Sequence, residues 1–284
     1  MGRISTGWKI VKQSFQVIKH DKEILIYPIL AGISILLVIG ILGILSILGI
    51  VGASIISPDL SYISLFFFFG AILVVSYFIS TFFQAAIVTS ATIRFSGKNP
   101  TLADGLRAPS KRILSLLAWG AISALVGTIL SAIKRSSSNR SQGITIASEI
   151  GTSLLGTAWK LITFFVIPII LFEKQGPIQS IKRSSTLFKK TWGENVTAQF
   201  SIAAILFLII LPFILLIILA ILSGSQAFII TSIILLTISI IIVNILSISV
   251  NGILRAALYH YAISGKMPHI YDNNTVKQMF TKNS

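Results

Sequence analysis

Long stretches of apolar sequence without any charged side chain constrain this chain more than any other feature. Residues 24–51 are uncharged throughout, and five further stretches are similarly apolar, of which only 149–172 contains charged residues, Glu149 and Lys160. The hydrocarbon core of a bilayer is about 30 Å thick, and about 20 apolar helical residues cross it. Because lipid offers no hydrogen-bond partners, the backbone N–H and C=O groups of each transmembrane segment must bond to one another, as they do in an α-helix. The chain is therefore predicted to be an all-α, polytopic membrane protein.

Six transmembrane helices are expected. They cover residues 24–51, 60–93, 113–133, 149–172, 197–222 and 227–254. Of the 284 residues 54% are hydrophobic and only 11% are charged, so little sequence remains for a soluble domain. We expect a single integral membrane domain over 1–284, with an N-terminal amphipathic helix at 1–23, a six-span bundle at 24–254 and a cytoplasmic segment at 255–284. The first apolar stretch is much longer than a signal-peptide core and is expected to be retained.

The net charge of +15 could indicate binding to nucleic acid, but the distribution of the charge argues against this reading. Of 23 Lys and Arg residues, 19 lie in 1–23, 94–112, 174–190 and 255–282, which the six spans put on one side. Such a bias is the positive-inside pattern. It predicts a multi-pass protein of the cell (cytoplasmic) membrane with both termini inside, and no nucleic-acid partner.

The segments between pairs of spans resemble one another. Ser96-Gly97-Lys98-Asn99-Pro100 recurs as Ser264-Gly265-Lys266-Met267-Pro268, and Lys174-Gln175-Gly176-Pro177 is a looser copy. Glycine ends a helix and proline favours the first turn of the next. The pattern indicates a threefold pseudo-repeat, in which each unit is an amphipathic helix followed by two spans. Glycine and proline after a span are, however, also common without any repeat.

Amphipathic helices are expected on the cytoplasmic side, where apolar residues step by three and four against lysines and arginines. Lys and Arg beside an anionic leaflet contribute about 1 kcal/mol each, so the expected partners are acidic lipid headgroups. Docking of a cytosolic protein is the alternative. The candidate contact residues are Trp8, Lys12, Phe15, Lys182, Arg183, Lys189 and Trp192.

One segment also resembles a known family. Residues 158–168 read AWKLITFFVIP, followed by Glu173, Gly176-Pro177, Ser184 and Trp192-Gly193, while residues 82–86 and 104–106 agree as well. The chain resembles a family of uncharacterised prokaryotic six-span membrane proteins, classed as a domain of unknown function, over nearly its whole length. More loosely, it is similar to the membrane domain fused to some glycerophosphodiester phosphodiesterases. The hydrolase half is absent here, so this similarity implies no enzymatic role.

Groups that could perform catalysis are scarce. The chain has no cysteine, which excludes disulfides and thiolate chemistry. His20, His260 and His269 do not have the spacing of metal ligands, and none of the eight acidic residues lies deep in an expected span. We therefore expect no enzyme, no metal and no cofactor, and a proton-coupled or cation-coupled transporter is disfavoured.

Lys160 is the exception among the charged residues, because it falls in the middle of the span expected at 149–172. A central lysine costs about 2.5 to 3.5 kcal/mol on insertion scales. It could reach the outer surface by snorkelling past Trp159, or it could face an anionic ligand. Polar side chains in other spans, notably Gln84 and Asn244, could border the same space or could be interhelical hydrogen-bond partners. The candidate ligand-binding residues are Lys160, Trp159, Gln84 and Asn244.

Two functions agree with these observations. The first is binding or translocation of a lipid, an amphiphile or a small anion. The second is a non-transporting scaffold or accessory subunit, whose basic helices organise lipids or recruit partners. Small residues such as Gly120 and Ala124 also make the span at 113–133 the best candidate for close helix packing.

Overall fold

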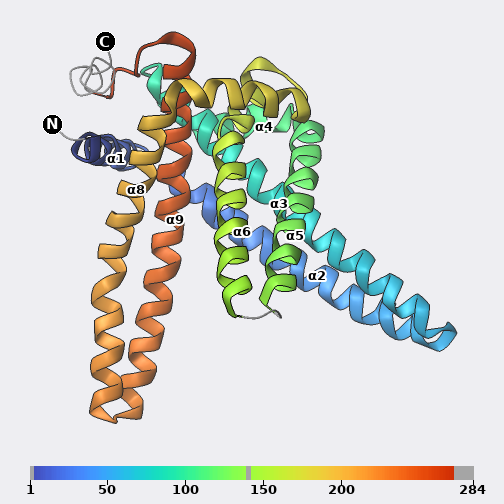
Figure 1. Cartoon of the computed structure of the whole chain (residues 1–284). Helices are drawn as coiled ribbons and strands as arrows, with labels where there is room; N and C mark the ends of the chain where they lie inside the picture. Colours follow the sequence, from blue (N-terminus) through green and yellow to red (C-terminus); the bar gives the residue numbers. More distant parts are fainter. Residues whose placement is uncertain (1–2, 139–141, 272–284) are drawn as a thin grey trace. The chain divides into compact units, whose positions relative to one another are not determined.

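The computed structural model describes residues 3–138 and 142–271 (Figure 1). Within this part of the chain, side chains are described except at 3–11, 136–138, 142–150 and 190–201. All regular structure in the described residues is helical. The elements are α1 (Arg3–His20), η1 (Lys22–Leu25), α2 (Ile26–Ile56), α3 (Pro58–Phe95), α4 (Leu102–Ser110), α5 (Ile113–Ser138), α6 (Gln142–Ile162), α7 (Val166–Pro168), the π-helical η2 (Ile169–Glu173), α8 (Pro177–Ser223) and α9 (Gln226–Ser264).

The six expected spans are confirmed as long apolar helical segments in the described residues. These segments are Lys22–Ile56, Pro58–Phe95, Ile113–Arg135, Gly151–Glu173, Ile202–Ser223 and Gln226–Ser264. The last of them runs ten residues beyond the predicted end at 254. The amphipathic segment and the span expected at 197–222 form one helix, α8, of 47 residues. That all six spans form one bundle in one domain stays a prediction.

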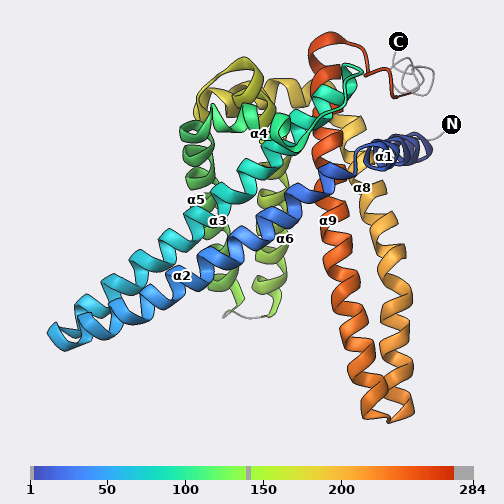
Figure 2. The ribbon, with the colours of Figure 1, turned by 180° about the vertical axis from the view of Figure 1, so that it is seen from behind.

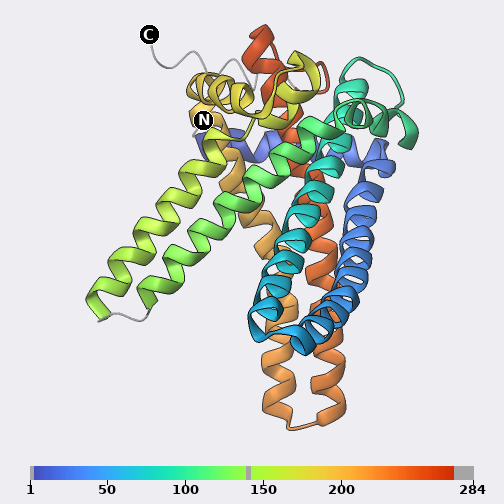
Figure 3. The ribbon, with the colours of Figure 1, turned by 90° about the vertical axis from the view of Figure 1, so that its right-hand side faces the viewer.

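The long helices form three antiparallel hairpins, α2 with α3, α5 with α6 and α8 with α9 (Figures 1, 2 and 3). Ser57 alone joins α2 to α3. Gly224, with φ +67°, and Ser225 join α8 to α9, and the Ser225 hydroxyl caps α9 by accepting the N–H of Phe228. Such short connections force successive helices to lie side by side.

The chain divides into two compact units. The first contains Met1–Pro28, Ile87–Asp104 and Lys189–Ser284, and the second contains Ile29–Ala86 and Gly105–Phe188. The first unit therefore holds α1, most of α8 and α9. The second holds most of the α2–α3 hairpin, the α5–α6 hairpin and the first turns of α8.

In the first unit, α1 packs against α9 and runs across it rather than along it (Figures 1 and 2). Its packing face consists of Ser14, Val17 and Ile18, which are buried and lie three and four residues apart. On α9, Gly252 allows the side chain of Ile87 to approach so closely that an added Cβ would overlap with it. Small residues thus bring helices of this unit into close contact.

Three connections share an unusual backbone position. Gly97, Lys174 and Gly265 have φ values of +82°, +59° and +70°, and each lies three residues before a proline. The left-handed conformation ends a helix, and glycine adopts it without the steric cost that a side chain brings. Lys174, not Gly176, is thus the residue whose conformation matches Gly97 and Gly265.

In the second unit, α5 packs directly on α3 through Gly120. A Cβ built on Gly120 would lie 2.9 Å from the backbone N and Cα of Phe78, and Ala124, one turn further on, is buried. The predicted role of the span at 113–133 in close packing is confirmed at this contact.

Replacement of Gly120 by alanine should therefore destabilise the protein, because the contact atoms belong to a backbone that cannot rotate away. Overpacking of this kind costs about 1–3 kcal/mol. The melting temperature in detergent should fall for Gly120→Ala. The matched control is Gly43→Ala in α2, where an added Cβ meets nothing within 4 Å, and its melting temperature should stay the same or rise. Equal melting temperatures for both variants would contradict this packing.

Candidate functional site

The fourth span is interrupted in its middle. The helix α6 ends at Ile162, residues 163–165 form a turn, and helical structure resumes at Val166. Pro168 explains the interruption, because its ring lacks an N–H and clashes with the carbonyl group four residues earlier, at Phe164. By contrast, Pro212 lies inside the continuous helix α8. The fourth span is therefore divided by a turn, whereas the fifth continues through its proline.

Ser184 from the first turns of α8 fills the hydrogen-bonding gap at this break. Its hydroxyl accepts the backbone N–H of Phe165 at 3.0 Å and donates to the carbonyl oxygen of Ile162 at 2.6 Å. Ser184 and Phe165 are both fully buried. An unsatisfied backbone group inside a membrane costs several kcal/mol. The Ser184 hydroxyl avoids this cost for two backbone groups at the break.

Lys160 lies in the last turn of α6, just before the break, and its side chain is exposed. A cation at this position interacts favourably with the negative end of the helix dipole. The neighbouring Trp159 is half-buried and stacks on Trp119 of α5, with ring centroids 6.0 Å apart and planes 26° apart. The predicted pair Lys160 and Trp159 thus lies beside a second tryptophan that the sequence analysis did not identify.

A polar stripe on α6 leads to Lys160. Ser153 and Thr157 are exposed, and they lie seven and three residues before Lys160, on the same side of the helix. Exposed apolar side chains of Leu154 and Leu155 flank this stripe. A headgroup and an acyl chain could therefore contact adjacent faces of one helix.

The two other candidate ligand residues belong to other helices. Gln84 is half-buried on α3 in the second unit and has at least one interaction partner within the protein. Asn244 belongs to α9 in the first unit, is exposed and donates to the Ile240 carbonyl oxygen at 2.8 Å. Lys160 and Trp159 are thus adjacent on α6, and a site that they share with Gln84 or Asn244 stays a prediction.

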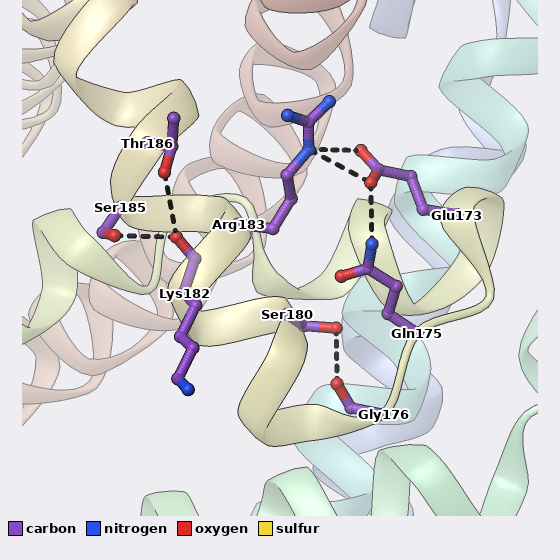
Figure 4. Close-up of polar contacts among 8 residues, drawn as sticks. All are labelled: Glu173, Gln175, Gly176, Ser180, Lys182, Arg183, Ser185 and Thr186. Carbon is purple, nitrogen blue, oxygen red and sulfur yellow. Dashed lines mark hydrogen bonds and ion pairs between the residues drawn. The ribbon is translucent and has the colours of Figure 1, made fainter.

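A polar clamp holds the start of α8 against the end of the fourth span (Figure 4). The guanidinium Nε of Arg183 lies 3.1 and 3.3 Å from the two carboxylate oxygens of Glu173. Gln175 donates its side-chain amide to the same carboxylate at 3.2 Å, and Ser180 bonds to the Gly176 carbonyl at 2.9 Å. With Ser184, these contacts fix the position of the first turns of α8 within the second unit.

This arrangement bears on the residues expected to contact lipid headgroups. Arg183 pairs with Glu173, whereas Lys182 and Lys189 are exposed, and the buried face of this part of α8 is formed by Ser180, Ser184, Leu187 and Phe188. On α1, Lys12 is exposed and Phe15 is half-buried. The side chains of Trp8 and Trp192 lie outside the described residues. Contact with lipid stays a prediction for all seven residues.

In the first unit, polar contacts join α1, α3 and the segment after α9. Asp21, which is buried, forms an ion pair with Arg94 of α3, and Arg94 also donates to Asn99. The hydroxyls of Ser14 and Tyr271 are 3.0 Å apart. Burial raises the pKa of the Tyr271 hydroxyl, an effect opposed by the bond to Ser14, so the phenol stays protonated at neutral pH. These groups connect helices and have partners within the protein.

Between residues 3 and 271, the described histidine and carboxylate side chains do not come together in groups of three or more that could hold a metal ion. The expectations of no metal, no cofactor and no catalysis stay predictions.

The helices and the interrupted span define a multi-pass membrane protein. Residues 59–269 match a family of unknown function, DUF6159, and the chain belongs to this family. The family resemblance in the sequence agrees with this finding, while the looser similarity to a phosphodiesterase membrane domain stays a prediction. The comparison with curated proteins finds no match for the chain.

Ser184→Ala should destabilise the second unit, because it removes the hydroxyl that bonds to Phe165 and Ile162. Each buried polar group left unsatisfied costs about 1–3 kcal/mol. We expect a lower melting temperature in detergent and faster amide exchange at 162–166. Ser185→Ala is the matched control, since the Ser185 hydroxyl donates to the carbonyl oxygen of Lys182 within the same helix. Unchanged exchange at the break in Ser184→Ala would contradict this role.

Proposed function

We propose that this protein binds an anionic amphiphile, namely a phospholipid, and that the Lys160 ammonium contacts its headgroup. The observation that carries the proposal is the exposed side chain of Lys160 within an apolar span, at the end of a polar stripe formed with Ser153 and Thr157. The role is one of binding or translocation, and we propose no catalytic step.

The depth of Lys160 supports an anionic partner. It lies nine residues after the start and thirteen residues before the end of the apolar segment Gly151–Glu173. Neither 151–172 nor α5 contains an acidic residue, so the sequence of this hairpin offers no carboxylate near that depth. A lysine in such a place must lose its proton, reach water or meet an anion. A phosphate headgroup supplies the anion, and water near the polar stripe can accompany it.

The surroundings of Lys160 suit an amphiphile better than a small ion. Leu154, Leu155 and Ile162 are 64%, 57% and 39% exposed and could contact acyl chains. Tryptophan is amphipathic and common where apolar and polar media meet, so the Trp119–Trp159 stack could pack at the boundary between headgroup and chains.

A scaffold role is the second candidate. Exposed Lys12, Lys19, Lys182 and Lys189 favour it, because helices that carry them could contact an anionic leaflet or an acidic partner. In this view, α1 and the start of α8 are interfacial on the cytoplasmic side.

The threefold pseudo-repeat is part of the proposal. Its support is that three connections contain a left-handed residue three positions before a proline, at Gly97, Lys174 and Gly265. The repeats are α1 to α3, α4 to η2, and α8 to α9, each an amphipathic segment followed by a hairpin.

Lys160→Met is the direct test of lipid binding. A hydrogen bond to a charged group contributes about 1.5–3 kcal/mol, so retention of phosphatidylglycerol should fall about 10- to 100-fold. Native mass spectrometry of the purified protein can measure it, with phosphatidylcholine as the zwitterionic reference. Melting temperature should stay the same or rise, because a desolvation cost disappears.

Lys134→Met is the matched control, since Lys134 is also exposed and lies on the same hairpin near its far end. This variant should retain the lipid. Undiminished retention of phosphatidylglycerol by Lys160→Met would refute the binding proposal and leave the scaffold role.

The proposed orientation, with both termini in the cytoplasm, rests on the bias of Lys and Arg. Single cysteines at Ser137, near the turn of the α5–α6 hairpin, and at Ser185, in α8, should react with an impermeant maleimide from opposite sides of intact cells. Reaction of Ser185→Cys from outside and protection of Ser137→Cys would reverse the orientation.

A further inference from the structure

An amide side chain projects from the middle of the most apolar part of α9. Asn244 is exposed and follows the first residue of this 39-residue helix by eighteen positions. It donates one N–H to the carbonyl oxygen of Ile240 at 2.8 Å. A primary amide has two N–H donors and an oxygen that accepts two bonds, so this contact uses only a part of its capacity. In hydrocarbon, the second N–H and the oxygen of this amide bind most favourably to another polar group.

Asn244 belongs to a regular row of residues, which we call the α9 seam: Thr237, Ile240, Asn244, Ser247 and Asn251. The spacing alternates between three and four residues, which is the heptad pattern of two helices that pack side by side. Thr237, Ile240 and Asn244 are exposed, and Ser247 and Asn251 are half-buried. A different face of α9, with Ser239, Val243 and Val250, is buried inside the first unit. The seam is thus distinct from the packing face that α9 already uses there.

We propose that the α9 seam binds the same seam of a second copy of this chain. Two copies inserted with the same orientation are parallel, and a twofold axis along the membrane normal brings each seam residue opposite itself. Asn244 then meets Asn244, and because an amide both donates and accepts, the two side chains can exchange hydrogen bonds. A parallel pair also brings Thr237 opposite Thr237 and Asn251 opposite Asn251, which puts polar groups together at three levels. The proposal is independent of lipid binding at Lys160.

The absence of cysteine from the sequence makes a sharp test available. A single introduced cysteine can form a disulfide only with another molecule. Thr237→Cys and Ile240→Cys lie on the seam, whereas Ile242→Cys is a matched control on the opposite side of the helix and is also 50% exposed. After mild oxidation in native membranes, the two seam variants should give a disulfide-linked dimer, and the control should give much less.

The contribution of the amide is measured by adding Asn244→Leu to Thr237→Cys. Interhelical hydrogen bonds in membranes are modest, and we expect dimerisation about 3- to 30-fold weaker. Asn244→Gln keeps an amide and should retain most of the cross-linking. Adding Lys160→Met should leave it unchanged, which separates this proposal from the lipid site. Cross-linking of the seam variants no stronger than that of Ile242→Cys, or undiminished by Asn244→Leu, would overturn the proposal.

Discussion

The requirement that every backbone polar group in a bilayer finds a partner governs this structure. The uninterrupted spans meet it with their own helical hydrogen bonds. The fourth span does not, because Pro168 breaks it, and the Ser184 hydroxyl supplies both the donor and the acceptor that the break needs. The start of α8 is consequently bound to the second half of that span, where the Glu173–Arg183 ion pair adds a second attachment. The end of α6, with Lys160, is defined by this break.

The sequence predicted the helical class and the six spans, because apolar length is a local property that lipid enforces directly. The predicted helix ends were less accurate. Helix α9 continues through Tyr259 to Ser264, and α8 joins an amphipathic segment to a span although the sequence shows no signal for this junction. The role of Ser184 could not be predicted, because it depends on a contact between residues about twenty positions apart. The tryptophan stack did leave a signal, since Trp119 lies nineteen residues before the end of α5 at Ser138 and Trp159 lies seventeen residues after the start of α6 at Gln142.

Polar side chains that face outward from apolar helices unite the two proposals. The Lys160 side chain carries a full positive charge, so its favourable partner is an anion. The Asn244 side chain is neutral and both donates and accepts hydrogen bonds, so a second amide is a favourable partner for it. Gln84 and Asn244 were grouped with Lys160 because all three are polar residues within spans, and that grouping stays a prediction. Gln84 belongs to the same compact unit as Lys160, whereas Asn244 belongs to the other unit. The chemistry of each side chain is therefore a better guide to its partner than the shared polarity of the spans.

A structure determined by electron cryomicroscopy in nanodiscs that contain phosphatidylglycerol would test the central claim most directly. The account predicts density for a phospholipid whose phosphate lies within hydrogen-bonding distance of the Lys160 Nζ, with acyl chains along Leu154 and Leu155. A Lys160 side chain that bonds only to a protein carboxylate, or that extends to bulk water with no lipid phosphate beside it, would contradict the account.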